Sequence, residues 1–351
     1  MSKILKTKKS KSSLLFYCAM CTLATPALAE NASQPTNKLT DGSLTTAITA
    51  INDEAAEWID DHHEDVQDRL RNLAHSMDKW FGEPDPQKPA SANLRVVFDT
   101  RWSNNPTDGS HVTVKPRIRG HIKLPVLERR LSIVIGDKDL DEQDVLTKGS
   151  AYGAGHTPNQ SKVLDGKQVR EDNASIALRW SKLEDTFGFD TDVGIRSGND
   201  LFLKFSVDKD LHQTDTWQIS NHNYYRYGTD SEHTLKGEIN TQYKLSATRY
   251  FNNNINLRYR HEDDREQTTW GNEVRHIHYF NNNKQLSYGL SSYGYLEDGR
   301  LSLNSYGPTV SYRQPFWRDW LFLQTEFSYF NDKKEDKSHF PSTLLRIEAL
   351  F

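Results

Sequence analysis

The sequence predicts an all-β fold: a transmembrane antiparallel β-barrel of about fourteen strands (twelve is the alternative), preceded by an N-terminal amphipathic helical segment. Three observations support this prediction. Apolar and polar residues alternate over most of residues 94–351, the chain starts with a signal-peptide pattern, and its last residues alternate up to a final phenylalanine. Because successive side chains of a strand point to opposite faces, such strands have one apolar and one polar face.

Residues 1–29 have the layout of a cleaved secretory signal peptide. Five lysines and no acidic residue precede the short apolar run 14–24, and Ala27-Leu28-Ala29 is a small-x-small cleavage site. Cleavage would remove both cysteines of the chain, Cys18 and Cys21. It would also change 44 basic against 48 acidic residues into 39 against 48. We therefore expect an exported, acidic chain without disulfides.

The next part of the chain predicts a helix. Residues 30–43 read as a flexible lead-in, 44–82 as an acidic amphipathic helix and 83–93 as a linker. The helix prediction rests on an apolar stripe at mostly three- and four-residue steps, which includes Trp58, Val66, Leu70, Leu73, Met77 and Trp80. Three roles remain open: a periplasmic spacer, a surface that binds a periplasmic protein through residues 44–81, or a plug inside the barrel.

Residues 94–351 predict the barrel domain, because stretches with a period of two follow one another to the end of the chain. Most are near the roughly 9–11 residues that a tilted strand needs to cross a membrane. A closed barrel satisfies its backbone groups without water. The expected strands are residues 94–103, 111–124, 129–137, 173–182, 187–197, 200–208, 215–227, 232–248, 254–263, 268–280, 285–296, 300–313, 319–331 and 341–351.

The connections between these strands should alternate in length, with short periplasmic turns and longer external loops. The longest external loop is expected at residues 138–172. The expected short turns are residues 125–128, 183–186, 252–254, 281–284 and 314–318.

The stretch 112–124, VTVKPRIRGHIKL, alternates most clearly. Its even-numbered residues are mostly apolar and would face lipid, whereas its odd-numbered residues are mostly basic and would face a water-filled lumen. Over all strands, basic residues outnumber acidic ones on the polar parity. We therefore expect a net cationic lumen, which favours anions. The alternative is that these groups pair with Asp and Glu and fill the interior. The predicted lumen residues are Arg95, Arg101, Lys115, Arg117, Arg119, Lys123, Arg179, Arg258 and Arg260.

The last strand places Leu345, Ile347 and Phe351 on one face. It resembles the terminal strand of Gram-negative outer-membrane β-barrel proteins, and the resemblance covers the signal peptide and residues 94–351. It implies recognition of these three residues by the barrel-assembly machinery, a place among outer-membrane lipids, and periplasmic N- and C-termini. A soluble β-sandwich would also alternate, but it would not need a terminal phenylalanine.

Signals for catalysis and metal binding are weak. Ser220 and His222 lie two apart on one expected strand, and His276 and His278 on another, but neither pair has an obvious third partner. The acidic and histidine-containing run 61–64 reads as a solvated helix face. We therefore predict no enzyme activity, no catalytic or metal-binding residue, no cofactor and no nucleic-acid partner.

Three functional hypotheses follow from the predicted barrel. The first is a passive pore with a weak anion preference, restricted by the acidic helix or by loop 138–172. The second is a non-conducting structural or interaction barrel whose periplasmic helix binds a partner. The third, a barrel enzyme that modifies lipids or peptides, would need a catalytic cluster at the lipid face or at the external rim.

Overall fold

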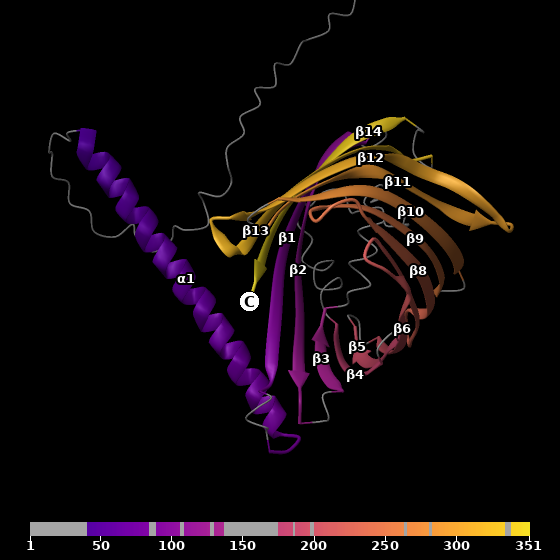
Figure 1. The fold of residues 1–351 in the computed structure, drawn as a ribbon, viewed down its shortest axis with the longest axis horizontal. Helices are drawn as coiled ribbons and strands as arrows, with labels where there is room; N and C mark the ends of the chain where they lie inside the picture. Colours follow the sequence, from indigo (N-terminus) through magenta and orange to yellow (C-terminus); the bar gives the residue numbers. More distant parts are fainter. Residues whose placement is uncertain are drawn as a thin grey trace, which may run out of the picture. The chain divides into compact units, whose positions relative to one another are not determined.

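The computed structural model describes residues 41–83, 89–105, 109–126, 130–136, 175–184, 187–196, 200–262, 265–280, 283–333 and 338–351 (Figure 1). The expected signal peptide, most of the lead-in and loop 138–172 lie outside these residues. Residues 60–351 form one compact unit, which contains the barrel and the second half of the helix.

The helix α1 spans Asp41–Lys79. It begins three residues before the predicted start and ends three residues before the predicted end. Gly82 follows with φ +150°, and a Cβ at this position would lie 2.9 Å from Cγ1 of Val126, so glycine lets the chain pass close to the barrel. Among the described residues, no helix is long and apolar enough to cross a membrane.

The described residues contain fourteen strands, which overlap the fourteen predicted ones. The strand predicted for residues 200–208 ends five residues later, at Gln213, and the other larger differences are given below. They are β1 (Ser91–Asn105), β2 (Gly109–Leu124), β3 (Leu131–Ile135), β4 (Ile176–Glu184), β5 (Phe187–Ile195), β6 (Leu201–Gln213), β7 (Trp217–Gly228), β8 (Glu232–Lys244), β9 (Arg249–Glu262), β10 (Arg265–Phe280), β11 (Lys284–Glu297), β12 (Arg300–Phe316), β13 (Arg318–Asn331) and β14 (His339–Leu350).

Every strand pairs antiparallel with its neighbours in sequence, and β1 pairs with β14 to close the barrel. The closing register runs from Arg95 opposite Leu350 to Ser103 opposite Ser342. In Figure 1 the violet β1 and the yellow β14 meet at this seam. The fold prediction is therefore confirmed, with fourteen strands instead of twelve. We call the end of the barrel where β1 begins and β14 ends the proximal end.

The two walls of the barrel have the polarity of a transmembrane β-barrel. Side chains of the apolar parity are exposed, as for Val193 (59%) and Leu290 (64%), whereas charged side chains of the other parity, such as Lys236 and Glu326, are buried. A water-soluble β-sandwich would bury the apolar parity instead. The outer wall is thus apolar and the inner wall polar, as expected for strands between lipid and a lumen.

Two of the predicted turns are wrong. Residues 252–254 belong to β9, and the turn before it consists of residues 245–248. Residues 314–316 extend β12, so that Trp317, with φ +70°, forms the connection to β13. At the end opposite the proximal end, the connections were expected to be long, but not all of them are. β11 and β12 are joined by Asp298 and Gly299, with φ +50° and +74°, as in a two-residue type I′ hairpin turn.

Residues 60–79 of α1 pack on the outer wall of the barrel, not in its lumen. Ala74 is fully buried in a cluster with Ile122 and Leu124, which belong to the apolar parity of β2. At the end of the helix, the buried Asp78 accepts a hydrogen bond from the backbone N of Val126 (3.2 Å). The hypothesis of a plug is therefore wrong for this part of the helix, because its apolar residues meet the apolar wall.

The buried face of the helix is rotated away from the predicted stripe. His63, Ala74 and Asp78 are buried, whereas Leu73 and Trp80 are exposed. Of the other stripe residues, Val66, Leu70 and Met77 are half-buried, and the side chain of Trp58 lies outside the described structure.

A second set of contacts attaches the helix to the end of the chain. The ring of His63 stacks on Trp320 (centroids 4.0 Å apart) and on Phe351 (4.8 Å), and its Nε2 donates to the carbonyl oxygen of Leu350 (2.8 Å). One turn earlier, Arg318 Nε donates to Asp60 Oδ1 (2.7 Å). Since Ala74 lies against β2, the helix crosses the seam between β14 and β1.

We expect His63→Ala to lower the free energy of unfolding by about 2 kcal/mol. The variant loses two ring contacts of about 0.5–1.5 kcal/mol each and one hydrogen bond. Urea-induced unfolding in phospholipid vesicles measures the difference. The control is His75→Ala, because His75 is exposed on the same helix. Equal destabilisation by both variants would contradict the contact described.

The stability of the fold should depend on pH through the carboxyl group of Asp60. The hydrogen bond from Arg318 lowers the pKa of this carboxyl below its usual value. A lowered folded-state pKa stabilises the fold above the unfolded pKa of about 4, and this contribution is lost as the pH falls through the folded value. Asp60→Asn should therefore destabilise the protein at pH 7, and the difference from the unmodified chain should shrink below about pH 4. Asp61→Asn, at an exposed neighbour, is the control.

Candidate functional site

The inner wall carries the predicted basic residues, and the strand register decides which of them meet. Arg95 and Arg117 come together with carboxylates at the seam, and Arg179 belongs to a separate cluster on β4–β6. Lys123 is exposed at the proximal end of β2. The remaining predicted lumen residues are half-buried, namely Arg101, Lys115, Arg119, Arg258 and Arg260.

At the seam, two carboxylates bind four arginines. Asp99 accepts two hydrogen bonds from Arg346, its partner across the seam (2.6 and 2.8 Å), and a further one from Arg117. Two guanidinium groups thus share one buried carboxylate, and the group carries a formal surplus of one positive charge.

Glu348 repeats this arrangement nearer the proximal end. Arg95 Nε lies 2.6 Å from Glu348 Oε1, and Arg313 Nη2 lies 3.2 Å from Oε2. The guanidinium of Arg313 also lies over the ring of Phe322, 3.7 Å from its centroid. We call the residues around Asp99 and Glu348 the seam cluster. Arg313 was missed as a lumen residue, although it shares the polar parity of Thr309 and Ser311.

Two groups of ion pairs farther around the barrel are balanced. Asp192 binds Arg179 through two bonds (2.6 and 2.7 Å) and lies 3.8 Å from Lys204, while Asp190 lies 3.6 Å from Arg179. This cluster holds two positive and two negative groups. On β8, the fully buried Lys236 pairs with Glu238 (2.7 Å). The positive surplus among these ion pairs is therefore concentrated at the seam.

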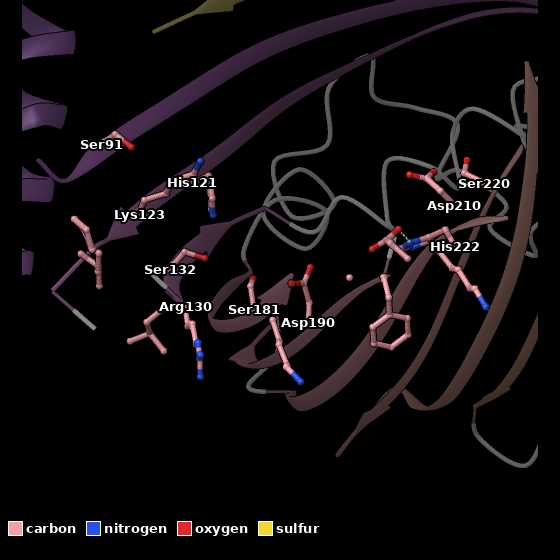
Figure 2. A pocket seen from close by; sticks show the side chains of 18 of the residues that line it. Ser91, His121, Lys123, Arg130, Ser132, Ser181, Asp190, Asp210, Ser220 and His222 are labelled. Atoms are coloured by element: carbon pink, nitrogen blue, oxygen red, sulfur yellow. Dashed lines mark hydrogen bonds and ion pairs between the residues drawn. The ribbon is translucent and has the colours of Figure 1, made fainter. Parts of the chain in front are cut away.

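A cavity of about 810 Å³ lies at the proximal end of the inner wall, lined by β1–β7. Figure 2 shows His121, Lys123 and Arg130 on one side of it, and Asp210 and His222 on the other. Three aspartates and four Lys or Arg residues line the cavity together with two histidines and several serines. The cavity is thus a polar vestibule with a slight excess of basic groups.

The histidine and serine noted in the sequence lie in this vestibule. His222 stands opposite Asp208 on β6, with 2.6 Å between Nδ1 and Oδ1, whereas Ser220 stands opposite Asp210. Serine and histidine are thus paired with different aspartates, which is not the shared relay that nucleophilic catalysis uses. Among the described residues, no group of three or more His, Cys, Asp or Glu side chains is arranged to hold a metal ion.

The residues expected to form the assembly signal lie on the outer wall. Leu345 is exposed, Ile347 and Phe351 are half-buried, and Phe351 exchanges backbone hydrogen bonds with Leu94 of β1 (2.8 and 3.0 Å). His63 of α1 covers the ring of Phe351. In this folded state, the end of the expected signal is part of the seam.

No protein-family model matches the chain, and no curated protein is similar to it. The similar solved structures include the outer-membrane channel DcaP of Acinetobacter baumannii (9% identity, TM-score 0.42, 77% of this chain and 99% of that chain). They also include outer-membrane expressed OmpT of Vibrio cholerae (8%, 0.44, 77% and 99%) and the anion-selective porin of Comamonas acidovorans (9%, 0.44, 75% and 100%).

The closed barrel with its apolar outer wall settles the fold. The chain has the architecture of a transmembrane β-barrel. The TM-scores to these structures are below 0.5, so the architecture of this chain rests on its own strand pairing and walls and not on this likeness.

We expect Asp99→Asn to destabilise the barrel by about 3 kcal/mol, because it leaves two guanidinium groups on the inner wall without their shared carboxylate. Unfolding in urea measures the loss. Asp215→Asn, at an exposed turn residue, is the control and should change little. If both variants unfold alike, the seam cluster does not stabilise the barrel.

Proposed function

We propose that the chain is an outer-membrane barrel that acts as a passive pore with a weak preference for anions. The observation that carries the proposal is the seam cluster, in which four arginines share two carboxylates. The proposed pathway contains no catalytic step and no cofactor.

The outer-membrane address is supported by the architecture and by the sequence. The outer wall exposes apolar side chains along the strands, and the sequence predicts a cleaved signal peptide for export. We propose that the proximal end faces the periplasm, so that both termini lie there. The proposed partners are outer-membrane lipids and, during insertion, the barrel-assembly machinery.

The anion preference follows from the distribution of charge. Fixed positive charges on the wall of a pore raise the local concentration of anions, and walls of low dielectric constant strengthen the effect. The seam cluster has a formal surplus of two positive charges, while the ion pairs on β4–β6 and β8 are balanced. A surplus of two charges in this cluster agrees with a weak preference better than a closed ring of positive charge would.

The vestibule is the proposed proximal entrance of the pathway. Its basic residues Lys123, Arg130, Lys182 and Lys209 would attract an anion toward the seam cluster. Restriction of the pore by residues 60–79 is not part of the proposal, because these residues lie on the outer wall. Restriction by loop 138–172 remains a proposal.

A second candidate is a structural barrel that does not conduct. The observation that favours it is the number of charged side chains packed and paired on the inner wall, among them the buried Lys204 and Lys236. Such pairing can fill a lumen instead of lining a path. In that case residues 44–81 would serve to recruit a periplasmic protein.

Single-channel recording in planar bilayers separates the two candidates. The pore predicts discrete conductance steps and a reversal potential in a salt gradient of the sign expected for anions. Lys123→Glu changes the charge of the vestibule by two units and should lower the anion-to-cation permeability ratio about two- to fivefold. The control is Lys79→Glu, because Lys79 is exposed at the end of α1.

The absence of conductance from correctly folded protein would contradict the pore and favour the structural barrel. A pore whose reversal potential has the cation sign would contradict the proposed anion preference alone. An equal change in both lysine variants would show that Lys123 has no special place on the pathway.

A further inference from the structure

Residues 60–81 present three different surfaces. One side contacts the barrel, with His63, Ala74 and Asp78 buried against it. The side turned away from the barrel is acidic and exposed, and it carries Asp61, Glu64, Asp65 and Asp68. A helix that packs on a protein and is otherwise surrounded by water needs only these two surfaces, one buried and one polar.

The third surface is apolar and uncovered. Leu73 is 46% exposed, Trp80 75% and Phe81 43%. Positions 73, 77 and 80 are four and three residues apart, and therefore lie on one side of a helix. Trp80 and Phe81 continue the last turn, since their backbone N atoms bond to the carbonyl oxygens of Met77 and Asp78 (3.1 Å each). We call Leu73, Trp80 and Phe81 the apolar edge.

The apolar edge continues the outer wall of the barrel. Met77 lies beside it and packs on the same cluster as Leu131 of β3. Leu131 pairs with Trp180, which is exposed on β4. At the other end of this helical segment, Asp60 binds Arg318, the neighbour of the exposed Trp317. The helix thus lies at the level of proximal tryptophans, and tryptophans in membrane barrels mark the boundary between lipid and water.

We propose that residues 60–81 form an interfacial membrane helix around the proximal rim of the barrel. The apolar edge lies among the phospholipids of the proximal leaflet, and the acidic side faces water. Helices with a large apolar face and a charged opposite face bind membranes in this orientation. The proposal requires the membrane insertion that is part of the proposed function, but it does not require that the barrel conducts.

Phospholipid fits the apolar edge better than a second copy of the chain does. The edge is continuous with the outer wall, which a transmembrane barrel exposes to lipid. The same lipid acyl chains can therefore cover the edge and the wall. A second copy that docked on the edge would bring Asp61 and Glu64 of the two copies close together, whereas Asp65 and Asp68 are paired with Arg69 and Arg71 of the same helix. Like charges placed opposite one another across an interface oppose association.

Nitroxide labels at single cysteines test the proposal in the full chain, reconstituted into phosphatidylcholine vesicles. Cys18→Ser and Cys21→Ser remove both native cysteines. Leu73→Cys and Trp80→Cys place a label on the apolar edge, Asp68→Cys places one on the acidic side, and Ile239→Cys places one on the outer wall of β8. Collision with oxygen, which concentrates in lipid, is compared with collision with the water-soluble complex nickel-EDDA.

We expect labels at positions 73 and 80 to collide several-fold more with oxygen than with nickel-EDDA, as at position 239, and the label at position 68 to show the reverse. If positions 73 and 80 resemble position 68, the edge lies in water and the proposal fails. Protection from both reagents would mean that protein covers the edge, which also overturns it, and spin–spin broadening would identify a second copy. If position 239 is not in lipid either, the membrane location itself is wrong.

Discussion

The pairing of β1 with β14 is the interaction on which the rest of the structure depends. It turns fourteen hydrogen-bonded strands into a barrel without edges, and an open edge in lipid would leave backbone groups without partners. The seam is reinforced on both walls. Inside, Asp99 of β1 binds Arg346 of β14, and Arg95 of β1 binds Glu348 of β14. Outside, residues 60–79 cross from Phe351 to β2.

This reinforcement also explains the excess of arginine at the seam. A single carboxylate can accept hydrogen bonds from two guanidinium groups, so a seam held by shared carboxylates keeps excess arginine. Asp99 and Glu348 each bind two arginines in this way, whereas the ion pairs on β4–β6 and β8 contain equal numbers of positive and negative groups. The groups that hold the barrel closed therefore also place a formal surplus of two positive charges at the seam.

The fold could be predicted from the sequence almost completely, because alternation along a strand is a local property that lipid and water impose on every residue. The errors arose where local signals compete. Residues 252–254 are asparagines, which favour turns, yet here Asn252 and Asn254 bond to Asn240 and to Glu238 of β8. The parity also predicted that charged and apolar side chains lie on different walls. It could not predict which cations share a carboxylate, since that depends on the register of strands far apart in sequence.

The place of the helix could not be predicted for a different reason. An apolar stripe shows that a surface must be covered, but not by what. Opposite net charges made a plug in the lumen one of the open roles of the helix. Long-range attraction between hydrated charges is screened by salt, whereas burial of Ala74 against Ile122 and Leu124 is not. The apolar contact with the outer wall therefore determines where residues 60–79 lie. It leaves the helix beside the lipid, where an apolar edge no longer needs a protein to cover it.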